Sequence, residues 1–182
     1  LHRDLKPANI LVADNEGKPA VKIIDFGLAR ALDERLGQDS VHTLHGQLLG
    51  TPEYMSPEQA AGDALGVDTR SDTYSLGVVL YELLCGELPM DTAELRSGSS
   101  ADIQRRILEH EPSKPSTKVS TMSGPASTAQ ARCLTRSTLH RQLKGDLDWI
   151  VLRAMAREPE RRYETPADLA HDLNRYLANE PV

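Results

Sequence analysis

The hydrophobic residues of this chain fall first into two short runs and later into longer, helix-like patterns. The two runs, Ile10–Val12 and Val21–Ile24, are β-prone and flank a polar cluster that contains Gly17 and Pro19. Such runs on either side of a glycine-containing turn predict a β-hairpin. An antiparallel hairpin would bring Asn9, before its first strand, close to Asp25, after its second strand.

Beyond residue 50 the apolar positions are spaced as in helices. A short helix is expected at 57–61, where Pro57 can occupy the first turn. The strongest helix is expected to begin at Ser71, a good N-cap, and to end at Gly86; its apolar residues cover nearly all faces, which predicts burial. Three further amphipathic helices are expected at 101–111, 146–156 and 165–177.

Two long stretches show little periodicity. Residues 28–49 are mostly polar. A loop is also predicted at 50–57, because one glycine and two prolines within eight residues (Gly50, Pro52 and Pro57) forbid a regular element. Residues 111–138 are rich in Ser, Thr, Pro and Lys, which is typical of an extended or disordered insertion. We place the boundaries of this insertion at 111–145 and assign it no chemistry.

Composition narrows the class of protein. The length of 182 residues fits one domain or part of a larger one, and the net charge of -6 gives no electrostatic reason to expect nucleic acid or an anionic membrane as partner. Cys85 and Cys133 have no metal-type spacing, so free thiols in a reducing, cytoplasmic setting are expected. The most apolar run, 76–84, contains Glu82 and is too short to span a bilayer, so no membrane contact is expected from this segment.

Residues suited to phosphate chemistry lie at the start of the chain. Asp4 could accept a proton from an attacking hydroxyl, Lys6 could neutralise a phosphate, and the amide oxygen of Asn9 could bind a hard cation such as Mg²⁺. Taken alone, this stretch could also be a chance run of polar residues on a loop, since single motifs misfire.

Three motifs occur in a fixed order along the chain. Residues 2–9 match the H-R-D-L-x-x-x-N catalytic loop, Asp25-Phe26-Gly27 matches D-F-G, and Ser56-Pro57-Glu58 stands where the same family has A-P-E. The chain therefore resembles the protein kinase superfamily. Lys6, in its Asp-Leu-Lys-Pro-Ala-Asn setting, resembles the serine/threonine branch.

The resemblance implies roles at the site, with ATP and Mg²⁺ (or Mn²⁺) as cofactors. Asp4 would orient and deprotonate the substrate hydroxyl, and Lys6 would neutralise the γ-phosphate. Asn9 and Asp25 would bind the metal. Thr51, in a Gly-Thr-Pro loop that would face the substrate, would form hydrogen bonds toward Asp4 and Lys6.

Other residues are implied to have structural or regulatory roles. Arg3, next to Asp4, marks kinases whose activation loop is ordered by phosphorylation, and Thr43, then Ser40, are the favoured phosphorylation sites. Both could also be unmodified loop hydroxyls. The supporting positions His2, Phe26 and Gly27 come from the motifs themselves.

Two longer-range contacts are also implied. Asp72, early in the buried helix, would accept backbone N–H bonds from the catalytic loop, although an aspartate there could simply complement the helix dipole. Glu58 would form a buried ion pair with Arg162, which matches the family position better than Arg161 does.

The implied fold class is mainly α: the C-terminal lobe of the protein-kinase-like α+β fold, with a short β-hairpin carrying the catalytic loop and D-F-G. Its expected parts are 1–27 (catalytic loop, hairpin and D-F-G), 28–58 (activation segment), 59–110 (helical core), 111–145 (insertion) and 146–182 (terminal helices). The chain end resembles planctomycete-like multidomain kinases.

The expected activity is that of a non-specific serine/threonine protein kinase acting on protein hydroxyls. The Gly-rich loop, the strand lysine and the helix glutamate of the family are absent, so the chain resembles a fragment that needs the N-lobe of its parent and is weak or inactive alone. One alternative is a truncated kinase that acts as a non-catalytic interaction module. Another is a small-molecule phosphotransferase of the aminoglycoside-kinase type, against which residues 50–58 argue.

Overall fold

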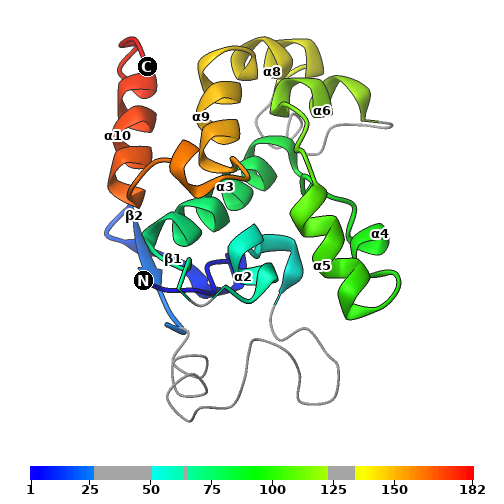
Figure 1. Ribbon diagram of the computed structural model, residues 1–182. Coiled ribbons are helices and arrows are strands. Elements are labelled where there is room, and N and C mark those ends of the chain that lie inside the picture. Colours follow the sequence, from blue (N-terminus) through cyan, green and yellow to red (C-terminus); the bar gives the residue numbers. More distant parts are fainter. Residues whose placement is uncertain (27–50, 64, 123–133) are drawn as a thin grey trace.

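A computed structural model describes residues 1–26, 51–63, 65–122 and 134–182, which form a mainly helical unit with one two-stranded sheet (Figure 1). The expected hairpin is confirmed. Strand β1 (Ile10–Asn15) pairs antiparallel with β2 (Lys18–Ile23), and Ile10 lies opposite Ile23. The turn is only two residues long, Glu16 and Gly17, and both have positive φ angles (55° and 79°), as tight hairpins of right-handed twist require.

The helix α3 (Thr69–Cys85) is the central element of the fold. Its predicted start at Ser71 is wrong: Asp68 is the N-cap and accepts the Arg70 N–H at 2.8 Å. Ser71 lies within the first turn, where its hydroxyl binds Glu58 instead. The predicted end is confirmed, because Gly86 closes the helix with φ 80°, a left-handed conformation that favours glycine.

The other predicted helices are also found, within one or two residues of their expected bounds. The short α2 spans Pro57–Ala61, α5 spans Ser100–Glu109, α9 spans Asp146–Ala154 and α10 spans Pro166–Leu177. The sequence did not predict α4 (Thr92–Arg96) or the single 3₁₀ turns η1 (Pro7–Asn9), η2 (Pro52–Tyr54) and η3 (Pro159–Arg161).

The expected extended or disordered insertion at 111–145 is wrong where the structure describes it. Helix α6 (Pro115–Thr121) and helix α8 (Arg136–Leu143) lie within it, and they bury Val119, Leu139 and Leu143 in the main core. Some of the polar residues that suggested an insertion form hydrogen bonds that cap or anchor these helices. Thr135 caps α8, and Ser116 donates from its N–H and its hydroxyl to the buried carboxylate of Asp148 at 2.9 and 2.6 Å.

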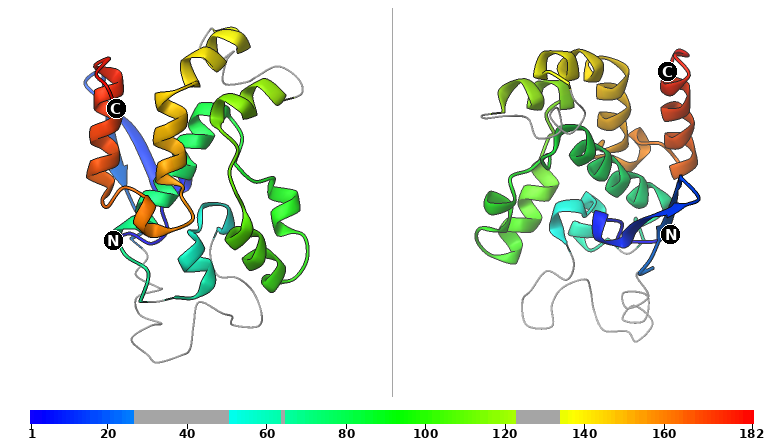
Figure 2. Two further views of the ribbon diagram at one scale, coloured as in Figure 1. Left: turned by 45° about the horizontal axis from the view of Figure 1, so that its top comes forward. Right: turned by 180° about the vertical axis from the view of Figure 1, so that it is seen from behind.

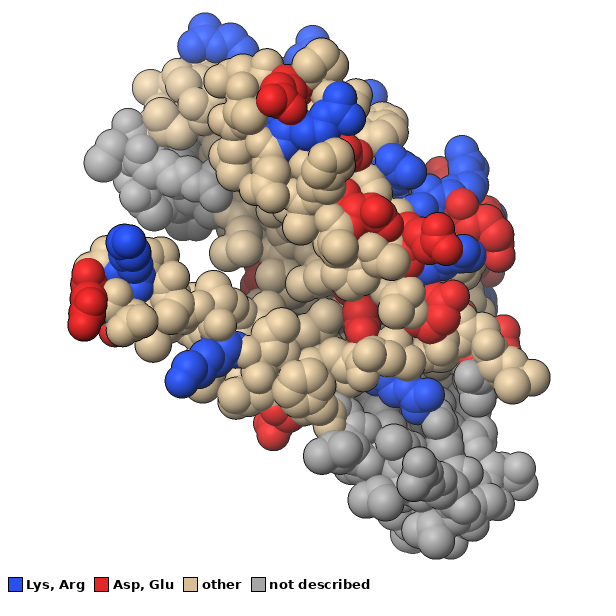
Figure 3. Space-filling model, turned by 90° about the vertical axis from the view of Figure 1, so that its left-hand side faces the viewer, with Lys and Arg blue, Asp and Glu red and all other residues tan. Residues whose placement is uncertain are grey.

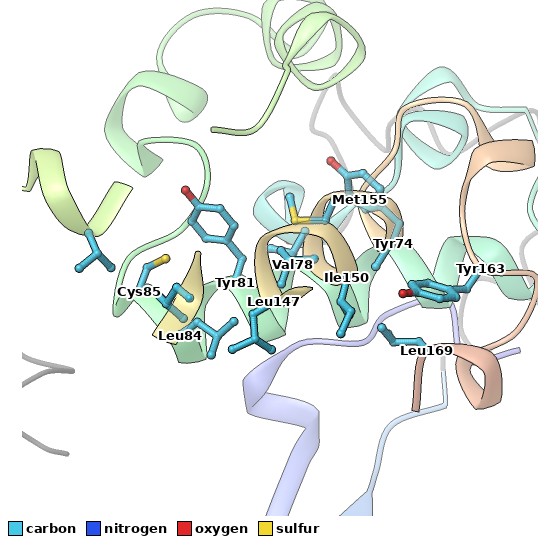
Figure 4. Packing of buried hydrophobic residues seen from close by; sticks show 14 of the residues in the cluster. Tyr74, Val78, Tyr81, Leu84, Cys85, Leu147, Ile150, Met155, Tyr163 and Leu169 are labelled. Atoms are coloured by element: carbon cyan, nitrogen blue, oxygen red, sulfur yellow. The ribbon is translucent and has the colours of Figure 1, made fainter. Parts of the chain in front are cut away.

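The main hydrophobic core lies where α3 meets α6, α8, α9 and α10 (Figure 4). Figures 1 and 2 show α10 alongside α9, with the hairpin near the N-terminal end of α3 and α6 near its C-terminal end. At Gly77 the contact between α3 and α9 is close: a Cβ there would lie 2.7 Å from the Met155 Cγ and 2.9 Å from the Ala154 Cβ. A smaller cluster, centred on Met55, Leu95 and Ile107, joins the segment before α2 to α4 and α5.

Several apolar side chains remain outside the core. Leu177, the last residue of α10, is 75% exposed. Trp149 is half-exposed, and the Arg153 guanidinium lies over both its ring and the ring of Tyr163, 5.0 and 4.1 Å from the two centroids. On the face shown in Figure 3, Lys and Arg are interspersed with Asp and Glu. Within the described ranges, no helix has both the length and the apolar character needed to cross a membrane.

Candidate active site

The backbone of the expected catalytic loop, residues 2–9, is held by the first turn of α3. The buried carboxylate of Asp72 accepts the His2 N–H at 2.7 Å and the Arg3 N–H at 2.8 Å. Both bonds are charge-assisted, and Asp72 also lies at the positive end of the α3 dipole. The helix dipole and the loop contacts therefore favour an anionic side chain at the same position.

His2 connects the catalytic loop to the end of β2. The Asp4 N–H donates to its Nδ1 at 3.3 Å, and its Nε2 lies 2.9 Å from the Ile24 carbonyl oxygen. Because a backbone N–H can only donate, Nδ1 must be the acceptor, and Nε2 then carries the proton and donates to Ile24. The ring also packs against Phe26, with centroids 4.9 Å apart, so the buried imidazole supports both the HRD-like and DFG-like motifs.

Asp4, Lys6 and Thr51 form a connected polar chain. The Lys6 Nζ lies 2.9 Å from the Asp4 Oδ2 and donates to the Thr51 Oγ1 at 3.0 Å. The bond expected from Thr51 therefore reaches Lys6, and Lys6 bridges to Asp4. Both charged side chains remain about a quarter exposed, so a substrate can reach them.

Asn9 is buried and contacts Asp4 through its side-chain amide. Its amide nitrogen donates to the Asp4 carbonyl oxygen at 2.8 Å and contacts the Asp4 Oδ2 at 3.3 Å. With both donors used in this way, the Asn9 side-chain oxygen is the atom available to a cation. The Ile24 N–H donates to the Asn9 carbonyl at 3.0 Å, so the hairpin places Asp25, the next residue, at the same end of the sheet.

These oxygens suit Mg²⁺. Asn9 supplies an amide oxygen and Asp25 an exposed carboxylate, and Mg²⁺ is commonly bound by one or two protein oxygens together with substrate phosphates. Within the described ranges, no group of three or more His, Cys, Asp or Glu side chains is arranged to hold a metal. Asp25 has φ 56°, and such left-handed residues cluster at functional sites.

Glu58 and Arg162 lie together in the interior. The Arg162 guanidinium donates to the two Glu58 oxygens at 2.7 and 2.8 Å, and the two side chains, Arg162 and Glu58, are 0% and 7% exposed. Burial by itself would raise the pKa of Glu58, but the hydrogen bonds and charge of Arg162, with the Ser71 hydroxyl, outweigh it and hold that pKa below its usual value. The anchored pair fixes α2 to the segment before α10.

Sequence reasoning missed three contacts that attach the segment after Thr51. The Gln59 side chain donates to the Arg3 carbonyl oxygen at 2.8 Å, the Tyr54 hydroxyl donates to Glu82 at 2.7 Å, and Arg96 binds the buried Glu53 through two nitrogens. None of these three contacts had a local signal: the Ser56-x-x-Gln59 spacing of a capping box indicates the bond between those two residues, not the bond to Arg3. Three expected site residues, Gly27, Ser40 and Thr43, lie outside the described residues.

Comparisons with known proteins agree with these motifs. The model of the protein kinase domain family matches residues 1–163. The serine/threonine-protein kinase PknB of Mycobacterium tuberculosis (strain H37Rv) is 39% identical over 181 residues, which is 100% of this chain and 24% of that protein. The probable serine/threonine-protein kinase CE0033 of Corynebacterium efficiens is 38% identical over 173 residues, 95% of this chain and 22% of the relative. This chain thus spans about a quarter of these relatives' length, and the planctomycete-like subfamily stays a prediction.

Solved structures show the same fold. A double mutant of the PknI kinase domain of Mycobacterium tuberculosis aligns with a TM-score of 0.55 and 23% identity, covering 96% of this chain and 46% of that one. A single mutant of the same domain gives a TM-score of 0.53 and 22% identity. These likenesses confirm the expected kinase-like fold. By its sequence matches, this chain belongs to the protein kinase domain family, among relatives that are bacterial serine/threonine kinases.

Proposed function

We propose that the protein transfers the γ-phosphate of ATP to a serine or threonine hydroxyl of a protein substrate. The observation that carries this proposal is the connected chain of Asp4, Lys6 and Thr51. Asn9 supports this chain by donating to the Asp4 carbonyl oxygen. Thr51 belongs to the segment that ends in Ser56-Pro57-Glu58, so the chain joins the catalytic loop to the proposed substrate loop. That connection favours a protein kinase over the small-molecule phosphotransferases.

In this reaction the substrate oxygen attacks the γ-phosphorus while the bond to the leaving ADP oxygen breaks. Asp4 accepts the proton of the attacking hydroxyl. The Asn9 amide nitrogen donates to the Asp4 main-chain carbonyl oxygen and contacts the Asp4 Oδ2, and these two contacts restrain the base. Lys6 places a positive charge between Asp4 and Thr51, where the transferred phosphate meets its acceptor. Charge stabilisation of this kind supplies most of the catalysis in phosphoryl transfer.

Asn9 and Asp25 are proposed to hold Mg²⁺ (or Mn²⁺). When bound, the metal neutralises charge on the ATP phosphates. Both residues lie at the end of the hairpin nearest Asp4, so the metal would hold the ATP phosphates close to the hydroxyl that Asp4 deprotonates. The ATP requirement also leads us to propose a cytoplasmic location.

We further propose that ATP binds between this chain and a second lobe. The hairpin presents apolar residues to solvent: Leu11, Val12, Val21 and Ile23 are between 44% and 68% exposed. Val12 and Val21 lie opposite each other in the ladder, so their exposed apolar side chains are neighbours, and adjoining exposed apolar side chains favour an interaction site. The solved PknI kinase domain is only 46% covered by this chain, which leaves room for a second half in that domain. Without such a lobe we expect residues 1–182 to be weak or inactive.

The test is phosphate transfer by the full-length protein, with radiolabelled ATP and casein as substrate. The Asp4→Asn variant should lose activity by a factor on the order of 10²–10⁴, because the variant side chain cannot accept the proton. Asp14→Asn is the matched control, since an asparagine oxygen can still accept the Gly17 N–H in the hairpin turn. Equal activity of Asp4→Asn and the wild type would overturn the proposed function.

A further inference from the structure

Gln59 links the helix α2 to the catalytic loop. Its side chain is 6% exposed, and both ends of the amide are used. The nitrogen donates to the Arg3 carbonyl oxygen at 2.8 Å, while the oxygen accepts the Ser56 N–H and the Ser56 hydroxyl, each at 3.1 Å. The amide orientation is fixed because the Ser56 N–H can only donate and the Arg3 carbonyl can only accept.

The backbone of Arg3 has a conformation that needs such support. It has φ 69°, the left-handed region that non-glycine residues rarely adopt and that persists only when the surroundings hold it. Its N–H is bound by Asp72 from α3, and its carbonyl is bound by Gln59 from α2. Two buried side chains from two helices therefore hold both backbone groups of the residue before Asp4.

The peptide between Arg3 and Asp4 sets the direction of the Asp4 side chain. The N–H of this peptide, which belongs to Asp4, donates to His2, and its carbonyl accepts from Gln59. Gln59 also lines the same small hollow as Asp4 and Thr51. A rotation of this peptide would turn the Asp4 carboxylate away from Lys6. The bond from Gln59 to the carbonyl oxygen of the peptide opposes such a rotation.

We propose that Gln59 is a positioning residue: through the Arg3 carbonyl it couples the docking of α2, at the end of the segment that begins at Thr51, to the orientation of Asp4. The inference rests on the proposed function, since it concerns the same base. Glu58, the neighbour of Gln59, is tied to the core by Arg162. The end of this segment is thus anchored to the helical core on one side and to the catalytic loop on the other.

The first test uses Gln59→Glu in the full-length protein. A glutamate is a standard partner for a capping box, so it can still accept from Ser56, but an ionised carboxylate cannot donate to the Arg3 carbonyl. We expect kcat to fall about tenfold, a barrier change of about 1.4 kcal/mol, with the KM values for ATP and casein within about twofold of the wild type. The matched control is Ser56→Ala, which removes one bond to Gln59 but keeps the donation to Arg3; its kcat should stay within about twofold.

A pH profile separates positioning from a purely structural role. As the pH falls, the carboxyl group introduced by Gln59→Glu becomes protonated and can donate its O–H to the Arg3 carbonyl, so the ratio of variant to wild-type kcat should rise.

If Gln59→Glu does not fold, Gln59→Met, which is similar in length and cannot donate, should show the same loss of kcat at pH 7. A kcat for the folded variant within twofold of the Ser56→Ala control would overturn the inference. The proposed function would still stand if Asp4→Asn were inactive in the same assay, so the two failures are distinguishable.

Discussion

Replacing Arg162 by methionine should be among the most damaging single changes in this chain. The guanidinium is fully buried and donates twice to Glu58 and once each to the carbonyl oxygens of Ala156, Arg70 and Arg157, at 2.6, 3.2 and 2.9 Å. Methionine is close to the apolar part of arginine in length but offers none of these donors. The change therefore leaves a buried carboxylate with the Ser71 hydroxyl as its remaining side-chain donor.

The magnitude follows from breaking a buried ion pair from one side. Removing one partner costs about 3–5 kcal/mol, because the other charge stays in a medium that solvates it poorly. The three carbonyl oxygens that lose a donor move the expected value toward the upper end of that range. In a protein of this size the loss corresponds to a decrease of about 10–20 °C in Tm.

The measurement is urea unfolding of wild type and variant at pH 7, with the slope m checked for constancy. Arg161→Met is the matched control, because the neighbouring Arg161 side chain is 77% exposed; its effect should stay within about 0.5 kcal/mol. The Glu58→Gln/Arg162→Met double variant should lose less than the sum of the single variants, since it leaves no buried charge. A loss below about 1 kcal/mol for Arg162→Met would refute the reasoning.

The Glu58–Arg162 pair also predicts that the stability of the folded protein decreases in acid. The pKa of Glu58 is lower in the folded protein than its ordinary value of 4.5, so the folded state binds this proton less readily than the unfolded state does. The stabilisation is present above pH 4.5 and is lost as the pH falls through the folded-state pKa. Arg162→Met removes the cause of the lowered pKa, so the variant should lose less additional stability than the wild type in that window.

Two further predictions concern the core. Leu139→Ala should destabilise the protein by about 2–5 kcal/mol, since Leu139 is fully buried in α8, and a loss below about 1 kcal/mol in urea unfolding would place α8 outside the core. Burial, with an added contribution from Glu58 and against the charge of Arg162, raises the pKa of Tyr74 from 10.0 to about 12. The folded protein should therefore lose stability as the pH rises above about 10, and the phenolate absorbance of Tyr74, isolated by comparison with Tyr74→Phe, should appear at lower pH in urea than in the folded protein.

Much of the fold was predictable wherever one helix carried many apolar residues. The helices α3, α9 and α10 have long patterns that fix both their existence and their approximate ends. The short helices α4, α6 and α8 were not predicted, because each buries only one to three residues and such a pattern cannot be told from chance. The start of α3 was placed three residues late because Asp68 and Ser71 are both good caps, and the choice depends on Glu58, which claims the Ser71 hydroxyl.

The candidate site divides in the same way. Asp4, Lys6 and Asn9 lie within six residues of one another, so their grouping is visible in the sequence. The bond from Gln59 is not visible in the sequence, because its acceptor, the Arg3 carbonyl, lies 56 residues away and carries no side-chain signature. Contacts between a side chain and a distant backbone group depend on tertiary packing alone, and for these the structure is needed.

The distances along the chain between partners have a consequence for how the protein is made. The bonds from His2 to Asp72 span 70 residues, and those from Arg162 to Glu58 span 104. Contacts this far apart close large loops, which slows their formation during folding. A ribosome that has released the catalytic loop must still release residue 162 before α2 gains its anchor. Asp4, Lys6 and Asn9 are thus translated before Asp72 and Arg162, the residues that hold this part of the chain in place.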